Sequence, residues 1–394
     1  MIFYRDKLDR ACEFVNALRG NGADGDHEEQ VLARAFGAEM EQMYVGSPEV
    51  AEVLLHAEHV LTFRNHIASE LSGEAEKNLR FLLGPEKLWQ PSRRDSGPAD
   101  GLPDFSGEDW KGKIHKIQEY AAGLPSSFFI VLIGNMVTEE ALPNYKTALD
   151  KIAATGNLSG ADTTPWAEWS CGWTAEEDRH GTVLRDYLSY TGKADMVEVD
   201  KSVASLLRKG FNLRIGLDPY KLFIYTSFQE RATKISHQNT GKVAEKYGDP
   251  VLSKICAAIS GDESRHETFY KNMMRAIFEN DPEGGMLAFE RLLCSQVVMP
   301  AELMEDGEPE LYKHFSLVAQ KERVYTTSDY VSIIEHLIGY WDITNRSVAG
   351  AAARAQEFIC SLPERYSRTL VPRMERLLSK FAKRKYAWLY GEMV

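Results

Sequence analysis

Cysteine is scarce in this sequence, with five residues in a chain of 394. The cysteines are odd in number, widely spaced and without any C-x-x-C pair: Cys12, Cys171, Cys256, Cys294 and Cys360. Neither their number nor their spacing indicates a disulfide framework. We expect reduced thiols in the core of an intracellular protein.

Long apolar runs are also lacking. The longest, from Phe128 to Ile133, is far shorter than the roughly 20 residues that a membrane helix needs, so we expect a soluble protein without a membrane span. Residues 1–40 contain many acids, which suits neither a secretory signal nor an acid-poor, Arg-rich transit peptide. No targeting segment is therefore expected.

Strand signals are few, whereas helical periodicity is strong throughout, so we expect an all-α protein. The expected helices span residues 28–44, 48–71, 74–83, 109–123, 127–154, 165–191, 196–208, 219–246, 250–278, 283–295, 311–322, 328–342, 346–361 and 364–383. Several are about twice the globular mean of about 11–12 residues, which favours a bundle of long helices with additional flanking helices. Residues 1–60 are expected to form a helical extension of unknown role and residues 61–394 a single domain.

Positive charge is in the minority. The net charge of −12 argues against a nucleic-acid partner and would repel an acidic partner at long range. The exception is the C-terminal basic stretch, Arg365 to Lys385, which contains eight cations and the single acid Glu375. This stretch is either a docking patch or an ordinary solvated helix face.

Two Glu-x-x-His motifs lie in strongly helical segments, at Glu177 with His180 and at Glu263 with His266. Residues three apart project from one helix face, so each motif could bind one metal ion. On frequency alone such motifs are unremarkable. The alternative without a metal is that both glutamates lie on the surface and both histidines are hydrogen-bonded within the core.

The order of the acids strengthens the metal interpretation. A helix with a central glutamate precedes each motif, Glu139 by 38 residues (139 to 177) and Glu230 by 33 residues (230 to 263). One Glu from each of two helices and Glu-x-x-His from each of two others is the ligand set of ferritin-like di-iron proteins. Four glutamates would neutralise two Fe²⁺ ions in a carboxylate-bridged centre, and oxygen with nitrogen ligands suits iron or manganese.

Pro143 lies within the expected helix 127–154 and has no N–H to bond the carbonyl of Glu139, four residues earlier. A kink or opened turn is therefore expected at this ligand. The kink is either functional or simply tolerated.

The chain resembles the plant-type soluble acyl-carrier-protein desaturases, the group of the plastid stearoyl enzyme, from about Leu79 to Lys380. The matching stretches are Leu88-Trp89-Gln90-Pro91, Thr138 to Pro143, Trp173 to Gly181, Tyr225 to Thr233, Asp262 to Thr268 and Met299-Pro300-Ala301. The resemblance implies the same six metal ligands: Glu139, Glu177, His180, Glu230, Glu263 and His266. It thus agrees with the ligand set that the spacing predicts.

Three further residues have roles by this resemblance. Asp262 would orient His180. Trp89 would extend the path from His180 and Asp262 to the surface, where reduced ferredoxin delivers electrons. The Thr233 hydroxyl would serve dioxygen at the irons. Without these roles, Asp262 would be an acid on a helix surface and Trp89 an ordinary aromatic of the core. Thr233 would be a threonine bonded back to its own helix.

The resemblance also implies the reaction and the partners. The family inserts a cis double bond into a saturated acyl chain on acyl carrier protein, using dioxygen and two electrons from ferredoxin, in fatty-acid biosynthesis. A homodimer is implied, in the plastid stroma if the source is a plant or alga and in the cytoplasm if it is bacterial. The carrier is acidic, so the C-terminal basic stretch is a candidate docking patch.

The sequence defines the specificity for the acyl substrate less well than the metal ligands. Residues expected along the acyl channel or at its mouth are Lys151, Leu222, Phe223 and Lys313. Three of them differ from the small, uncharged or acidic residues of the stearoyl enzymes, namely Lys151, Leu222 and Lys313. Chain length and double-bond position therefore stay open.

Two other classes remain as alternatives: another ferritin-like di-iron oxygenase or hydroxylase, including a radical-generating reductase subunit, and a non-enzymatic iron-binding protein. A reductase subunit would be expected to have Asp in place of Glu139. Membrane desaturases need several His-rich boxes, whereas His56 and His59 form a single H-x-x-H.

Overall fold

The computed structural model describes residues 48–92, 97–210, 213, 215–295, 297 and 299–394, with side chains from residue 57 onward. The expected helix 28–44, Cys12 and the side chain of His56 lie outside this range. The chain divides into two compact units, Met1–Arg64 and Asn65–Val394. Within the first unit the described residues belong to α3 (Pro48–Glu70), which continues into the second.

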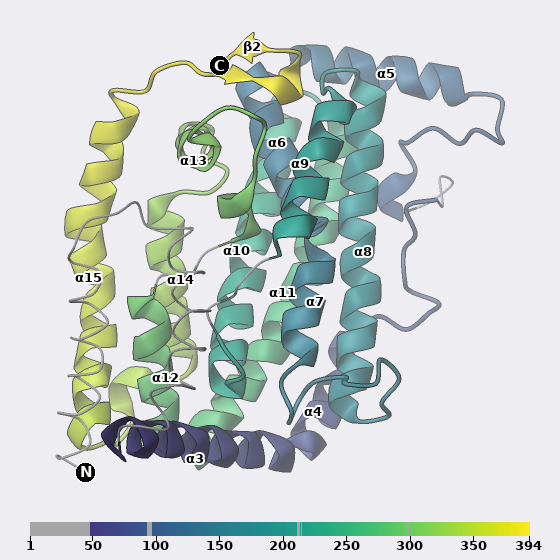
Figure 1. The fold of residues 1–394 in the computed structure, drawn as a ribbon. Helices are drawn as coiled ribbons and strands as arrows, with labels where there is room; N and C mark the ends of the chain where they lie inside the picture. The colour runs from purple at the N-terminus through teal and green to yellow at the C-terminus, as the bar shows by residue number, and fades with distance from the viewer. Residues whose placement is uncertain (1–47, 93–96, 211–212, 214, 296, 298) are drawn as a thin grey trace. The chain divides into compact units, whose positions relative to one another are not determined.

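The second unit is helical almost throughout (Figure 1), as predicted. Its further α-helices are α4 (Ser72–Asn78), α5 (Trp110–Gly123), α6 (Ser126–Glu139), α7 (Leu142–Asp150), α8 (Pro165–Thr191), α9 (Met196–Lys209), α10 (Pro219–Lys246), α11 (Pro250–Asn280), α12 (Pro282–Cys294), α13 (Leu311–Lys321), α14 (Thr327–Tyr340) and α15 (Gly350–Leu378). Short 3-10 turns are η1 (Leu79–Phe81), η2 (Gly97–Ala99), η3 (Pro300–Leu303), η4 (Ile343–Asn345) and η5 (Ala387–Leu389). Strands β1 (Lys385–Tyr386) and β2 (Glu392–Met393) pair antiparallel.

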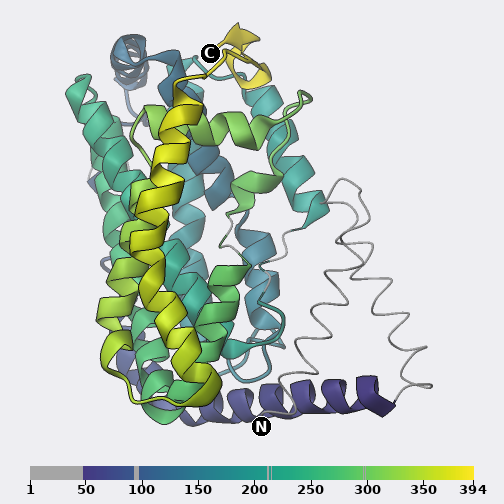
Figure 2. The same cartoon turned by 90° about the vertical axis from the view of Figure 1, so that its left-hand side faces the viewer.

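Four helices form the centre of the bundle. Helix α6 contacts α8, α8 contacts α11, α11 contacts α10, and α10 contacts α6, which closes a ring. α12, α14 and α15 pack together beside α10 and α11 (Figures 1 and 2), while α5 and α7 contact α8. This is the predicted long-helix bundle with flanking helices.

Helices α8, α10, α11 and α12 start at clear sequence signals. Each begins with a capping side chain followed by proline: Thr164-Pro165 for α8, Asp218-Pro219 for α10, Asp249-Pro250 for α11 and Asp281-Pro282 for α12. The cap accepts a hydrogen bond from a first-turn N–H. Proline has no backbone N–H, and it fits the first helical position because an N–H there would have no acceptor within the helix. In α8, α10 and α11 these starts fix where the predicted ligands fall along the helix.

Helix α6 is the most buried of the four central helices, since every residue from Phe128 to Glu139 is buried. An all-round apolar helix of this kind lies inside a protein core. The predicted helix 127–154 is in fact two helices, because α6 ends at Glu139 and α7 begins at Leu142. The opened turn expected from Pro143 is thus confirmed, and it lies directly after Glu139.

Two expectations need correction. The predicted helices 346–361 and 364–383 are one helix, α15, which contains Pro363 and Pro372. Proline costs about 3 kcal/mol inside a helix, but packing against α12 and α14 keeps α15 continuous. The free thiols are also not all in the core: Cys256 is buried, whereas Cys171 and Cys294 lie on exposed helix faces and Cys360 is half-buried.

Within the described residues, none of the helices has the length and apolar character to cross a bilayer by itself. A strongly bent pair, Trp110–Gly123 with Ser126–Asp150, meets that test by length and composition alone.

Candidate metal centre

The six predicted ligand side chains converge at the centre of the four-helix ring. They come from its four helices, Glu139 from α6, Glu177 and His180 from α8, Glu230 from α10, and Glu263 and His266 from α11. All six are buried. The repeat of a lone Glu followed by Glu-x-x-His is therefore a spatial arrangement as well as a sequence pattern.

The convergent atoms form two overlapping groups. Glu139, Glu177, His180 and Glu263 offer ligand atoms within 4.8 Å of one another, and so do Glu177, Glu230, Glu263 and His266. Glu177 and Glu263 belong to both groups. This is the geometry of two neighbouring cation positions that share two carboxylates.

Each histidine directs one ring nitrogen inward. The Nδ1 atom of His180 lies 3.4 Å from Glu177 Oε2 and 3.5 Å from Glu263 Oε1, and Nδ1 of His266 lies 2.7 Å from Glu177 Oε1. The outward Nε2 atoms face other carboxylates, Asp262 Oδ2 at 3.2 Å from His180 and Glu176 Oε2 at 3.0 Å from His266. Since those oxygens are acceptors, we assign the ring proton to Nε2, which leaves Nδ1 as a metal donor.

Several buried polar atoms at this centre have no hydrogen-bond partner among the described residues. They are Glu263 Oε1 and Oε2 and His180 Nδ1, whereas Glu177 Oε1 and His266 Nδ1 lie 2.7 Å from each other. Unsatisfied buried polar groups are costly and rare. Because carboxylate oxygen and imidazole nitrogen are donors that suit iron or manganese, the residues present fit a pair of such ions.

The electrostatics of the carboxylates point the same way. Burial and the charges of Glu177 and Glu263 raise the pKa of Glu230 well above its usual value. Burial and the charge of Glu177 also raise the pKa of Glu263. Burial opposes ionisation of Glu177 too, but His180 and His266 hold its pKa below the usual range. Nearby cations would relieve this repulsion.

The imidazoles respond to the same carboxylates. Burial alone would lower the pKa of His180 and His266, yet the surrounding acids raise both well above the ordinary value. A site without an ion therefore favours protons on these rings. Metal binding requires neutral imidazole, so it would release those protons.

Asp262 connects His180 to Trp89, as the resemblance implied. The Trp89 Nε1–H donates to Asp262 Oδ2 over 2.9 Å, and the Trp89 and His180 rings are stacked with centroids 6.3 Å apart. The Arg179 guanidinium lies over the Trp89 ring at 4.8 Å and also donates to Asp262. Trp89 is half-buried, so a contiguous path leads from His180 outward.

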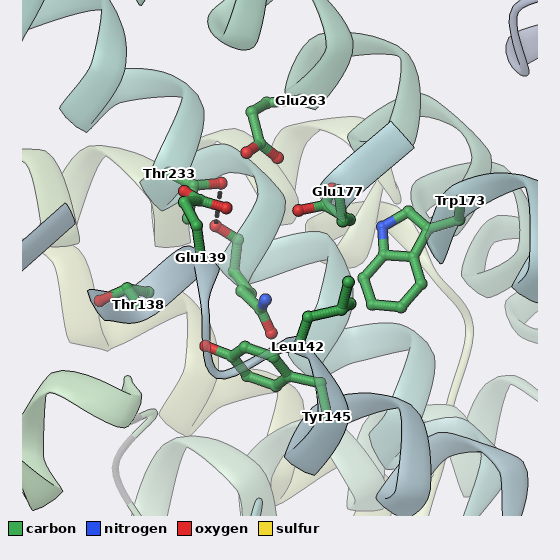
Figure 3. A pocket seen from close by; sticks show the side chains of 9 residues that line it. Thr138, Glu139, Leu142, Tyr145, Trp173, Glu177, Thr233 and Glu263 are labelled. Carbon is green, nitrogen blue, oxygen red and sulfur yellow. Dashed lines mark hydrogen bonds between the residues drawn. The ribbon is translucent and has the colours of Figure 1, made fainter. Parts of the chain in front are cut away.

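A pocket opens beside the first group of ligands (Figure 3). The residues that line it are Thr138, Glu139, Leu142, Tyr145, Trp173, Glu177, Gln229, Thr233 and Glu263. Thr233 therefore borders the same space as three predicted ligands. Its hydroxyl donates to the carbonyls of Gln229 and Glu230 over 3.2 and 3.1 Å, so it is also bonded back to its own helix.

A model of the fatty acid desaturase family matches residues 64–390. The chain belongs to this family. It is 42% identical over 331 residues to the chloroplastic acyl-[acyl-carrier-protein] desaturase of Cucumis sativus, an alignment covering 83% of this chain and 82% of the relative. It is 40% identical over 334 residues to the chloroplastic stearoyl-[acyl-carrier-protein] 9-desaturase of Olea europaea, covering 84% of each. The predicted family is thus confirmed.

The desaturase family match extends over nearly the whole second unit. The corresponding stearoyl enzyme of Gossypium hirsutum is 41% identical over 333 residues, covering 83% of this chain and 82% of the relative. A solved acyl-ACP desaturase structure from Mycobacterium tuberculosis aligns with a TM-score of 0.49 at 20% identity, covering 74% of this chain and 99% of that chain. That likeness is too distant to add to the family assignment.

The four expected specificity residues do not line the pocket shown in Figure 3. Lys151 is exposed at the end of α7, and Lys313 is exposed on α13, where it pairs with Glu310 at 2.8 Å. Leu222 and Phe223 are buried in α10. Their roles in the desaturase stay predictions.

Sequence reasoning missed Glu176, which pairs with His266 as Asp262 pairs with His180. Arg265 Nη2 donates to both acids, to Glu176 Oε2 and to Asp262 Oδ1, each over 2.6 Å. A signal was present in the sequence, because an acid directly precedes each Glu-x-x-His motif. Each such acid orients the histidine of the opposite helix.

Sequence reasoning also missed the groups that hold the two lone glutamates. His237 Nε2 lies 2.7 Å from Glu139 Oε1, and Trp173 Nε1–H donates to Glu230 Oε1 over 3.1 Å. His237 and Trp173 are both buried. No spacing rule links either pair.

Gly181 lets the end of α6 approach α8. A Cβ at this position would lie 2.9 Å from Glu140 Cγ and 3.6 Å from Glu139 Cβ. We therefore expect Gly181→Ala to lower the free energy of unfolding by about 1–3 kcal/mol, because it overpacks this contact. Urea unfolding of the metal-free protein measures the change.

Gly261→Ala on α11 is the matched control, because a Cβ there meets nothing within 4 Å. Its expected effect is a gain of up to about 1 kcal/mol from better helix propensity. Equal stabilities for the two variants would show that the close approach at Gly181 is unimportant.

Proposed function

We propose that this chain is an acyl-[acyl-carrier-protein] desaturase whose active site contains a pair of iron ions. The proposed ligands are Glu139, Glu177, His180, Glu230, Glu263 and His266. The observation that carries the proposal is the pair of buried four-residue groups that share Glu177 and Glu263. The 40–42% identity to relatives named as acyl-carrier-protein desaturases supports it.

The bound iron pair would supply dioxygen activation and the removal of two hydrogens from adjacent methylenes, which leaves a cis double bond. The protein supplies the rest of the site. Glu177 and Glu263 would each contribute to holding both ions, the outward Nε2 bonds fix both imidazoles, and burial keeps bulk water from the centre. The pocket bordered by Thr233 and Glu139 would give dioxygen a place beside the ligands.

Electrons would arrive through Trp89 and Asp262. The half-buried Trp89 ring, its hydrogen bond to Asp262 and the contact of Asp262 with His180 support this route. Reduced ferredoxin is the proposed donor. We also propose a homodimer, a single catalytic domain within residues 61–394 and, because the relatives are chloroplastic, a plastid location if the source is a plant or alga.

The substrate carrier would dock on the C-terminal basic stretch. In this stretch Arg368 pairs with Glu364 and Arg384 with Asp306. The remaining six cations are exposed and have no ion pair among the described residues: Arg365, Arg373, Arg376, Lys380, Lys383 and Lys385. Their free charge suits an acidic carrier and could offset the long-range repulsion from the net charge of −12.

The proposed function is tested by incubating the iron-loaded protein with reduced ferredoxin, oxygen and a panel of saturated acyl-carrier substrates. Mass spectrometry of the released chains then locates any double bond. Loss of two hydrogens at one defined position supports the proposal. A hydroxylated product, or iron uptake without any product, would contradict it.

Charge reversal tests the docking surface separately. Arg373→Glu with Arg376→Glu is expected to raise KM for the acyl carrier on the order of tenfold at low salt, with kcat nearly unchanged. The two positions lie on the exposed face of α15. Screening should shrink the difference as salt increases.

The control reverses one exposed charge elsewhere, Lys116→Glu on α5. This variant should keep its KM. A double variant in α15 with unchanged KM would show that the basic stretch is a solvated helix face.

A further inference from the structure

Arg185 of α8 pairs with the residue that directly follows Glu139, in the opened turn between α6 and α7. Its Nε donates to Glu140 Oε1 over 2.5 Å, its Nη2 donates to the other oxygen of the same carboxylate, and its Nη1 donates to Asp200 of α9. We propose that Arg185 is a positioning residue that fixes this turn and thereby keeps Glu139 in place as a ligand of the metal pair. The inference rests on the proposed metal centre and deepens it.

The turn between α6 and α7 has no capping side chain of its own. Ala141, the N-cap of α7, makes no side-chain cap bond, and Pro143 has no N–H for the carbonyl of Glu139. The starts of α8, α10, α11 and α12, in contrast, each have a Thr or Asp cap. A capping contact for this turn therefore has to come from another helix.

Arg185 lies on the same face of α8 as a predicted ligand. Glu177, Gly181 and Arg185 follow one another at intervals of four residues, so their side chains form a row along the helix. The Glu140 side chain packs along this row, because a Cβ on Gly181 would lie 2.9 Å from Glu140 Cγ and Arg185 binds the carboxylate one turn later. The row that carries Glu177 thus also holds the residue next to Glu139.

The contact between Arg185 and Glu140 is well suited to fixing a position. Two N–H groups of a planar guanidinium meet the two oxygens of one carboxylate, which sets the direction of the contact as well as its length. The Glu140 side chain is 16% exposed, so its carboxylate is largely shielded from water. The bond to Asp200 anchors the same guanidinium to α9. The turn is therefore connected to two helices at once.

Glu139 depends on this turn because it is the last residue of α6. Its Oε2 lies 3.7 Å from Nδ1 of His180, and it belongs to only one of the two ligand groups. The other three predicted glutamate ligands lie inside the unbroken helices α8, α10 and α11. Loss of the Arg185 contact should therefore weaken the ion beside Glu139 and spare the other ion.

The test is a titration of the metal-free protein with Co²⁺, in which visible absorption follows the number of ions bound. The wild type should bind two ions per chain. We expect Arg185→Met to weaken the binding of one ion about tenfold. This is the lower end of the usual effect of losing a partner outside the metal ligands, because Arg185 acts through the turn.

The sign of the change separates positioning from simple charge. Removing the positive charge of Arg185 would by itself strengthen the binding of a nearby cation. Weaker binding in Arg185→Met therefore cannot be a charge effect. Glu140→Met removes the same contact from its other side, and the double variant should bind like the weaker single variant, because both substitutions remove one shared contact.

Two further variants complete the titration. Arg185→Lys keeps the charge but cannot bond both oxygens of Glu140 in the same way, so it should lose less affinity, and it keeps the test available if Arg185→Met fails to fold. Lys201→Met on α9 is the matched control, since it removes an exposed cation whose ion pair with Glu198 lies within one helix. It should bind both ions like the wild type.

Hydrogen exchange of the metal-free proteins measures the turn directly. The backbone amides of Glu140 and Ala141 bond carbonyls of the last turn of α6. Both amides should exchange faster in Arg185→Met than in the wild type or in Lys201→Met. A general loss of stability would instead raise exchange throughout the helices.

The outcomes separate this inference from the proposed function. If the wild type and a folded Arg185→Met bind both ions equally well, or if exchange in the turn is unchanged, the inference is wrong and the proposed metal centre stands. A wild type that binds no pair of ions would overturn the metal centre and the inference together. Weaker binding of one ion, with faster exchange confined to the turn, supports the inference.

Discussion

Glu263→Gln is expected to abolish formation of the metal pair and, with it, desaturation. Glu263 belongs to both ligand groups, is 1% exposed, and neither of its oxygens has a hydrogen-bond partner among the described residues. The amide removes one negative charge and directs an N–H toward the position of a cation. We expect activity to fall by more than the 10–100-fold that loss of an outer partner costs. Metal analysis should find fewer than two ions per chain.

Asp178→Asn is the matched control for this change. Asp178 is the exposed neighbour of Glu177 on α8, so the same loss of charge occurs one residue from a ligand but outside the site. It should retain metal and activity. The metal-free Glu263→Gln protein should unfold no earlier than the metal-free wild type, because a neutral amide costs less to bury than a carboxylate. Two tightly bound ions in Glu263→Gln would contradict the shared role of this residue.

Asp262→Ala is expected to lower the free energy of unfolding of the metal-free protein by about 3–5 kcal/mol, the usual cost of removing one partner of a buried ion pair. Asp262 accepts hydrogen bonds from Trp89 and Arg179 and contacts the Nε2 of His180. It is the only described hydrogen-bond partner of the Arg179 guanidinium, which is 4% exposed. Urea unfolding measures the loss.

Two controls show whether the charge of Asp262 matters. Asp262→Asn keeps the size and one acceptor oxygen, so its loss of stability should be smaller. Asp178→Ala is a surface change and should stay within about 0.5 kcal/mol of the wild type. If Asp262→Ala costs no more than Asp178→Ala, the buried network around Arg179 does not depend on this carboxylate.

The sequence was sufficient to predict that the six ligand residues converge. Helical periodicity places Glu177 beside His180 and Glu263 beside His266, and the order of the lone glutamates before them matches a ring of four helices. Capping residues followed by proline stand at the starts of α8, α10, α11 and α12. Local rules of this kind act over a few residues, which a sequence shows directly.

What the sequence could not show depends on contacts between distant residues. His237 bonds Glu139 across 98 positions and Trp173 bonds Glu230 across 57, so no spacing rule relates either pair. The continuity of α15 through Pro363 depends on packing against neighbouring helices rather than on propensity. The exposed positions of Lys151 and Lys313 likewise follow from the fold.

Anomalous scattering at the iron absorption edge, from crystals of the iron-loaded protein, would decide whether this chain holds a metal pair. The predicted map has two iron peaks per chain, one among Glu139, Glu177, His180 and Glu263, and one among Glu177, Glu230, Glu263 and His266. A single peak, no peak, or iron bound away from these six side chains would contradict the account.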